Sequence, residues 1–165
     1  MEKNFFEWVL FFIQGNWQQF LLGTATTLLI SLSGTIIGFF LGLGVSLIRY
    51  MKSDDKTTLF IKSIIKFFQI IVNIYIAIFR GTPMIVQAMV IFYGLPVLTK
   101  GSLNLDPLPA ALLIVSINTG AYMAEMIRGG VDSVDPGQLE GAQAIGMSHF
   151  QAMLSIIFPQ AVRNV

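Results

Sequence analysis

Four polar side chains in apolar stretches are the residues best placed to do chemistry, namely Gln87, Asn118, Tyr122 and Glu125. Asn118 and Tyr122 precede Glu125 by seven and three residues, so the three share one face of a helix. A carboxylate within a membrane span is costly, and by default it indicates a pathway or a buried ion pair. Glu125 could therefore titrate in an ion-coupled carrier, or it could pair with Arg128 or Arg80 to orient the helix end. Gln87 could hydrogen-bond a neighbouring helix or contact solute.

Catalytic constellations are not found in the sequence. The chain has one histidine, His149, in a polar connector where we expect a surface position. It has no cysteine, no zinc-binding motif and no phosphate-binding loop of the G-x-x-x-x-G-K type. We therefore expect no catalytic residue, no metal site and no cofactor bound by this chain. The net charge of +1 does not point to a nucleic-acid partner.

The composition predicts an all-α, polytopic helical membrane protein. Of 165 residues, 55% are hydrophobic and 12% charged, whereas soluble domains average about 25% charged. Charged residues are missing from 8–48, 67–79, 81–99 and 107–124. Because a bilayer core needs about 20 apolar residues per helix, we expect spans at about 20–48, 82–98 and 107–127, and the start of a fourth from about 150. Residues 1–165 would form a single transmembrane domain.

Two features at the ends of the chain add to this prediction. The aromatic segment 5–12 is typical of a helix lying at the membrane interface. The chain stops at Val165, too soon to complete a fourth span, so we expect a fragment or a truncated product.

Within the first span, small residues recur at intervals of three or four, which favours close packing of another helix: Thr24, Thr27, Ser31, Gly34, Gly38 and Gly42.

Segment 60–80 is ambiguous. It is apolar enough for a span, but its polar residues fall on one helical face, which favours an amphipathic element at the interface or along a cavity: Lys62, Lys66, Gln69, Asn73 and Arg80. A cluster of cations spans the start of segment 60–80 and the residues before it, namely Arg49, Lys52, Lys56, Lys62 and Lys66. The positive-inside rule places this cluster in the cytoplasm. With 60–80 amphipathic, the N-terminus is outside and 128–149 is cytoplasmic. Counting 60–80 as a full span would put 128–149 outside.

Segment 128–149 contains a polar helix–glycine–helix unit. Asp135 can cap the first helix with Pro136 at its first position, and Gln138 lies three residues after the cap. Gly146 is placed to end this helix in a left-handed conformation. Ser148 and Gln151 form a second capping box. A rigid polar unit of this kind suggests a binding partner outside the membrane.

Two further breaks are expected. Arg128-Gly129-Gly130 predicts the end of the third span. Arg80-Gly81-Thr82-Pro83 predicts a break and restart, with Thr82 as the cap and Pro83 at the first helical position. Pro159 lies inside the last helical stretch, where a membrane helix tolerates it as a kink.

The helix–glycine–helix unit resembles the EAA motif of ATP-binding-cassette importer permeases. The matching residues are Glu140-Gly141-Ala142, then Gly146, then Ile156-Ile157-Phe158-Pro159. Two further stretches, RGTPMIVQ at 80–87 and GAYMAEMIRGG at 120–130, are similar to the polar-amino-acid branch of this family. Gly141 departs from the usual alanine, which loosens the helix by up to about 1 kcal/mol.

The resemblance implies a MetI-like permease fold in a bacterial cell membrane. It implies that 128–149, which we call the coupling segment, contacts a cytoplasmic ABC ATPase that holds ATP and Mg²⁺. A second permease subunit, identical or different, and an extracellular or periplasmic solute-binding protein would complete the importer. The residues implied in ATPase coupling are Gln138, Glu140, Gly141, Ala142, Gly146 and Pro159. Arg80, Pro83 and Arg128 are structural or gating candidates.

Three alternatives stay open at this point. The chain could be an ion-coupled secondary carrier that uses Glu125, although such a carrier needs no capped cytoplasmic unit. It could be an importer permease for another small solute. It could also be a membrane scaffold without transport activity.

Overall fold

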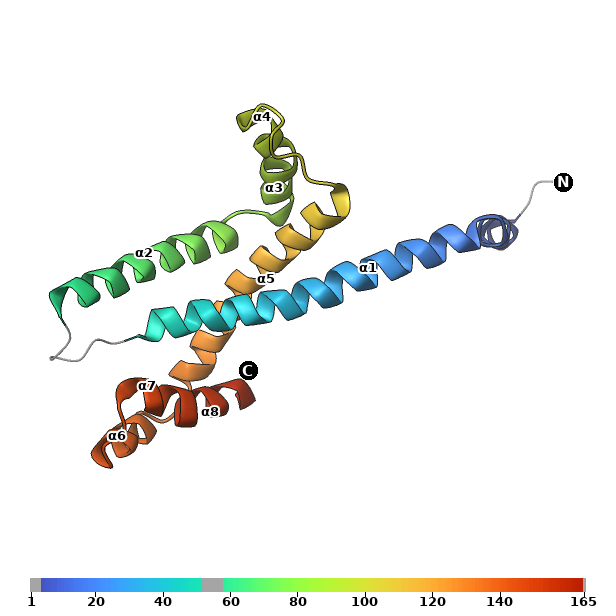
Figure 1. Cartoon of the computed structure of the whole chain (residues 1–165). Helices are drawn as coiled ribbons and strands as arrows, with labels where there is room; N and C mark the ends of the chain where they lie inside the picture. Colours follow the sequence, from blue (N-terminus) through green and yellow to red (C-terminus); the bar gives the residue numbers. More distant parts are fainter. Residues whose placement is uncertain (1–3, 52–57, 165) are drawn as a thin grey trace.

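A computed structural model describes residues 4–51 and 58–164, and the described residues form helices and connecting turns without a strand. Lys52, Asp54, Asp55 and Lys56 of the expected cytoplasmic loop lie outside the described residues. Figure 1 shows α1 as the long axis of the molecule, with α5 crossing it and α6 to α8 gathered near the C-terminus. The elements are α1 (Phe5–Tyr50), α2 (Leu59–Gly81), α3 (Met84–Met89), the π-helical turn η1 (Val90–Gly94), α4 (Leu95–Leu98), α5 (Pro107–Asp132), α6 (Pro136–Ala144), α7 (His149–Ala152), the π-helical turn η2 (Met153–Ile157) and α8 (Phe158–Arg163).

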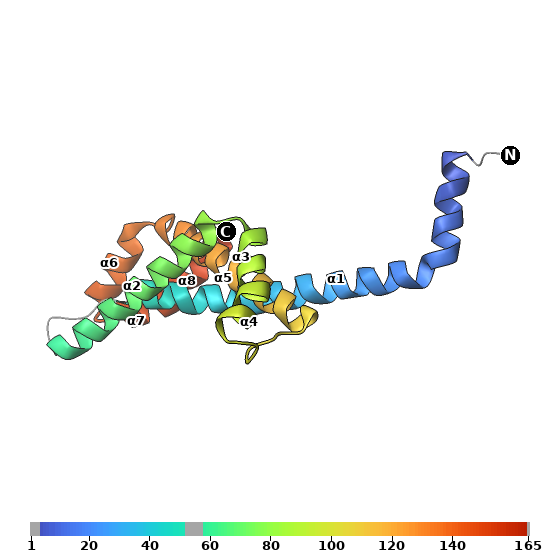
Figure 2. The ribbon, with the colours of Figure 1, turned by 90° about the horizontal axis from the view of Figure 1, so that it is seen from above.

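The first helix contains a sharp bend near its start. Asn16 leaves the helical region with φ −129° and ψ 16°, and its side-chain amide donates to the Phe12 carbonyl at 3.1 Å. Figure 2 shows the stretch before this bend turned away from the rest of α1. This stretch exposes large aromatic side chains, including Phe5 and Phe6. It therefore has the composition of an interfacial helix, while an interfacial position itself stays a prediction.

Glycines bring α1 and α5 into close contact. A Cβ atom built on Gly34 would lie 2.6 Å from a Val115 methyl carbon, and one on Gly42 would lie 2.9 Å from the Ala124 backbone nitrogen. Since side chains larger than hydrogen do not fit, the two backbones approach closely along this line. The predicted packing stripe is thus confirmed for its glycines. The other half of the stripe differs, because Thr24 and Thr27 are exposed and their hydroxyls donate to carbonyls of their own helix.

The second helix contacts both α1 and α5 through polar side chains. The Gln69 amide donates to backbone carbonyls at the end of α1, including that of Met51 at 2.9 Å. The Tyr75 hydroxyl donates to the Ile117 carbonyl of α5. Because Gln69 meets the end of α1, the residues of α2 before it extend past that end, as Figures 1 and 2 both show.

Three helices in the described part of the chain are long and apolar enough to cross a membrane, namely α1, α2 and α5. The stretch Met84–Leu98 is apolar but shorter. Length and composition therefore do not separate an amphipathic 60–80 from a full span, and the predicted division between 60–80 and 82–98 stays a prediction.

Two helix ends differ from the prediction. Helix α5 does not stop at Arg128-Gly129-Gly130 but continues to Asp132, because neither glycine adopts the positive φ that would end a helix. Thr82 does not cap α3. Its backbone N–H and its hydroxyl both donate to the Ile78 carbonyl, so it terminates α2, and Pro83 is the residue that precedes α3.

The core at the C-terminal end joins α5 to η2 and α8. Ile127, Val134 and Met153 are buried in one apolar cluster together with Ile157 and Phe158. Pro159 is the second residue of α8, which follows the π-helical turn η2. A wider turn accommodates a residue that lacks a backbone N–H, so the helical path continues through the proline as predicted.

Candidate functional site

Local hydrogen bonds define the shape of the coupling segment. The Asp135 carboxylate accepts from the Gly137 N–H at 2.7 Å and caps α6, while the Gln138 N–H donates to the Asp135 carbonyl. Gly146 has φ +90°, as predicted. The Gly146 N–H donates to the Gln143 carbonyl at 3.0 Å and the Met147 N–H to the Ala142 carbonyl at 3.1 Å, which is the Schellman arrangement. Helix α6 therefore ends at a fixed angle.

The second helix of the unit begins with the predicted capping box. The Gln151 N–H donates to the Ser148 hydroxyl at 3.2 Å, and the Ser148 N–H donates to the Gln151 side-chain oxygen at 3.0 Å. His149 was expected at the surface, but it is half-buried, with its Nε2 atom 3.2 Å from the Tyr50 carbonyl. A contact between residues 99 apart cannot be predicted from local pattern.

The coupling candidates do not all face outward. Gln138, Glu140, Gly141 and Gly146 are exposed, whereas Ala142 is only 3% exposed and packs inward. Sequence reasoning missed Ile145, a large apolar side chain that is 79% exposed at the end of α6. An isolated apolar side chain at the tip of a polar unit is well suited to insert into a groove of a partner.

Tyr50 connects three parts of the molecule. Its hydroxyl donates to an Asp132 carboxylate oxygen at 3.2 Å at the end of α5. Its ring meets the edge of Phe158 with centroids 6.3 Å apart, and its carbonyl contacts His149. The last residue of α1 is thus joined both to α5 and to the segment that follows α6.

A second site, which we call the Glu125 junction, gathers three arginines around one carboxylate. Glu125 lies 3.1 Å from Arg80 of α2 and 2.8 Å from Arg128 of its own helix, and it also pairs with Arg49 of α1. The side chain of Glu125 is 14% exposed, while those of the arginines are 31 to 41% exposed. The predicted pairs with Arg80 and Arg128 are confirmed. Arg49 was missed because it lies 76 residues away.

Gln87 and Asn118 form a separate network beside the Glu125 junction. The Gln87 amide donates to the carbonyls of Phe79 and Thr82 at 3.0 and 2.9 Å, and its oxygen accepts from Asn118 at 3.0 Å. Gln87 is 7% exposed. These bonds hold the break between α2 and α3 against α5, which is the first of the two roles considered for Gln87, while contact of Gln87 and Asn118 with solute stays a prediction. Tyr122 differs, because it is 46% exposed with the Arg80 guanidinium 5.6 Å from its ring centre.

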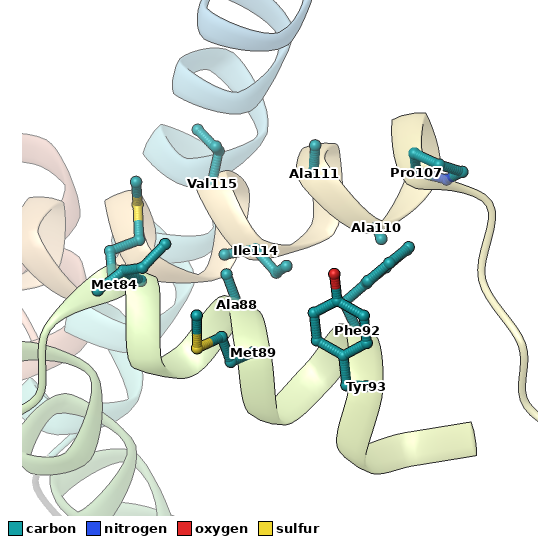
Figure 3. Close-up of a pocket in the computed structure, with 11 residues that line it drawn as sticks. Met84, Ala88, Met89, Phe92, Tyr93, Pro107, Ala110, Ala111, Ile114 and Val115 are labelled. Carbon is teal, nitrogen blue, oxygen red and sulfur yellow. The ribbon is translucent and has the colours of Figure 1, made fainter. Parts of the chain in front are cut away.

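An apolar cavity of about 420 Å³ lies between α3, η1 and the first half of α5. Figure 3 shows Ala88, Met89 and Phe92 on one side and Ala110 and Ile114 on the other. Its lining offers no charged group to a polar solute. The described residues also contain no group of three or more His, Cys, Asp or Glu side chains that could hold a metal ion.

Comparison with known protein families shows which family the chain belongs to. Residues 59–165 match the model of the binding-protein-dependent transport system inner membrane component. The chain belongs to this family. It is accordingly a multi-pass protein of the inner membrane, and the predicted all-α permease fold is confirmed.

The similar proteins include amino-acid permeases. The chain is 35% identical to the arginine transport system permease protein ArtQ of Bacillus subtilis, over 87% of this chain and 59% of the relative. It is 46% identical to the probable amino-acid permease protein YxeN of the same organism, over 56% of this chain and 41% of the relative. The crystal structure of an amino acid ABC transporter with histidines matches with a TM-score of 0.75 and 32% identity, over all of this chain and 68% of that one. The chain thus spans about half of the length of these curated relatives.

Proposed function

We propose that this chain is a permease subunit of an ATP-driven amino-acid importer. The observation that carries the proposal is an exposed, doubly capped coupling segment in a member of the transport family. The relatives named as an arginine permease and a probable amino-acid permease, and the structure of an amino acid transporter, support amino acids as the substrate class.

The coupling segment would contact a cytoplasmic ABC ATPase, which binds ATP and Mg²⁺. Glu140, Ile145 and Gly146 are exposed and would form the contact surface, together with Gln138 and Gly141. Ala142 is buried and would instead hold α6 against the rest of the chain, as Pro159 would by shaping α8. A segment closed by caps at both helices moves as a unit and passes displacement on.

Displacement of the coupling segment has two connections to the spanning helices. One runs through His149 and Tyr50 into α1. The other is the chain itself, because the segment begins in the last turn of α5, where Arg128 pairs with Asp132. Both lead to the Glu125 junction, where α1, α2 and α5 meet. We assign this junction to the gate of the solute pathway.

The remaining polar candidates take roles around this gate. Tyr122 is exposed beside Arg80 and would contact solute. Gln87 and Asn118 would shape the pathway wall, since their amide groups are occupied by each other and by the backbone. Pro83 would fix the break between α2 and α3.

The coupling segment would face the cytoplasm and the N-terminus the outside. The contact between His149 and Tyr50 supports this orientation, because it puts the segment at the same end as Arg49 and Lys66. A second permease subunit and an external solute-binding protein would complete the importer.

The chain has no cysteine, so Ile145→Cys and Ser102→Cys can each be labelled singly. An impermeant maleimide should label Ser102→Cys in intact cells and Ile145→Cys only after permeabilisation, and the reverse pattern would refute this orientation.

Replacement of Gly146 tests the coupling role. In proteoliposomes with the ATPase and the binding protein, Gly146→Val should insert normally but lose uptake and solute-stimulated ATP hydrolysis. Its control is Gly44→Ala, which also lies in open space but within α1, away from the coupling segment, and should keep both activities. Normal coupling in Gly146→Val would refute the proposal.

An ion-coupled carrier is the competing function. The Glu125 carboxylate is engaged by three arginines, which leaves it poorly placed to bind a sodium ion or to release a proton during transport. Uptake that collapses with ionophores and needs no ATPase would favour the carrier instead.

A further inference from the structure

A basic cavity lies where the end of α1 meets the first half of α2. It has a volume of about 590 Å³ and is lined by seven residues, which are Arg49, Tyr50, Met51, Lys62, Ile65, Lys66 and Gln69. Gln69 donates to three backbone carbonyls at the end of α1, so it holds the two walls together. The cavity is therefore built into the fold by contacts that do not involve its lysines.

The lysines of this cavity are not neutralised within the described residues. Lys62 and Lys66 lie one helical turn apart and take part in none of the ion pairs there, while Arg49 is paired with Glu125. The adjoining stretch 52–57 has two lysines and two aspartates, and so no net charge. Two cations one turn apart form a site for an anionic group such as a phosphate.

The surroundings favour a lipid as the source of that phosphate. Helix α2 presents a broad apolar surface outside the cavity, where Ile61, Phe67 and Phe68 are 48, 61 and 49% exposed. A lipid can place acyl chains along such a surface while its headgroup reaches the lysines, which a soluble anion cannot do. Basic pockets between membrane helices on the cytoplasmic side are suited to anionic headgroups.

We propose that the cavity between α1 and α2 binds the phosphate headgroup of an anionic membrane phospholipid through Lys62 and Lys66. This inference is independent of the proposed transport function, since it requires only that the chain lies in a membrane. Bound lipid would brace α2 against the end of α1, the region that also supplies Arg49 to the Glu125 junction.

The test is a lipid titration of the full-length protein purified in neutral detergent, read by native mass spectrometry. Phosphatidylglycerol should bind more tightly than phosphatidylcholine. Lys62→Gln/Lys66→Gln should weaken phosphatidylglycerol binding by about 25-fold, or about fivefold for each lysine. Lys62→Arg/Lys66→Arg should retain binding, because the charges remain. Lys100→Gln, which removes an exposed lysine from the turn after α4, is the matched control and should have no effect.

Three results would overturn the proposal. The first is equal binding of the two lipids by the unmodified protein. This measurement does not depend on whether any variant folds. The second is full retention of phosphatidylglycerol by Lys62→Gln/Lys66→Gln. The third is displacement of the lipid by inorganic phosphate at constant ionic strength, which would identify a soluble anion as the ligand. None of these results bears on whether the chain couples to an ATPase.

Discussion

The coupling segment draws its shape from residues within a few turns of one another, whereas the Glu125 junction joins side chains as far as 76 residues apart. In the first region a left-handed glycine and two caps fix the angle between short helices. In the second, three helices are held by ion pairs and by a close backbone contact. The difference teaches that the segment proposed to contact the ATPase takes its shape from local bonds, while the proposed gate depends on contacts between residues far apart in the chain.

Removal of the shared carboxylate should have the largest effect. Glu125→Ala leaves three arginines without their common partner and should lower the free energy of unfolding in detergent by about 2 kcal/mol. This value lies between the costs for buried and for surface pairs, because the arginines are about one-third exposed or more. Thermal unfolding of the purified protein measures the change.

The control for this variant is Asp132→Asn. Of the three arginines of the junction, only Arg128 pairs with Asp132, and the side chain of Asp132 is 54% exposed. Its loss should cost less than about 1 kcal/mol. Equal destabilisation by the two variants would show that Glu125 does not act as a shared centre.

The helix crossing beside the junction should be almost as sensitive. A Cβ atom on Gly42 would lie 2.9 Å from backbone atoms of Gly120 and Ala124, which cannot move without shifting α5. Gly42→Ala should therefore lower the unfolding free energy by about 1–2 kcal/mol. Gly44→Ala places a methyl group in open space and should be neutral in the same thermal assay, so a loss at both positions would argue against the close approach.

A change in the coupling segment should act locally. Gly146 has open space around it, so Gly146→Ala should be costly only through its φ of +90°, by about 1 kcal/mol. Hydrogen exchange of the α6 amides should speed up by about fivefold, while exchange in α5 should not change. Faster exchange in both helices would show that the segment is not an independent unit.

The smallest effect should come from Gly141. It lies inside α6 with nothing near its missing side chain, so Gly141→Ala should stabilise the helix by up to about 1 kcal/mol. Slower hydrogen exchange confined to α6 would be the expected result. Faster exchange would contradict the open environment of this position.

The same contrast explains what could be predicted from sequence. Asp135, Gly146 and Ser148 act on neighbours within a few residues, so their cap and turn patterns were sufficient to predict the shape of the coupling segment. Arg49 was assigned to a loop charge cluster, because nothing local indicates that the end of α1 lies beside α5. The contact of His149 with Tyr50 was missed for the same reason.

Helix ends were harder to predict than helices. The pair Gly129-Gly130 resembles a terminator, but Gly130 is buried in the packed interior and the helix continues through it. Thr82 carries the residue type of an N-terminal cap, yet its hydroxyl bonds backward to Ile78 and forward to Gln87. Packing against other helices therefore accompanies the continuation at Gly130, whereas at Thr82 hydrogen bonds to residues four and five positions away fix the helix end.

Cross-linking from the tip of the coupling segment tests the central proposal most directly. The assembled transporter would carry Ile145→Cys, or as matched control Ala142→Cys, three residues away on the buried side of the same segment. With a cross-linker that carries a maleimide for the introduced thiol and a benzophenone that inserts into neighbouring C–H bonds on illumination, Ile145→Cys should form a covalent product with the ATPase subunit, and Ala142→Cys should not. Absence of that product from an assembled, ATP-hydrolysing complex, or equal yield from Lys100→Cys in the turn after α4, would contradict the account.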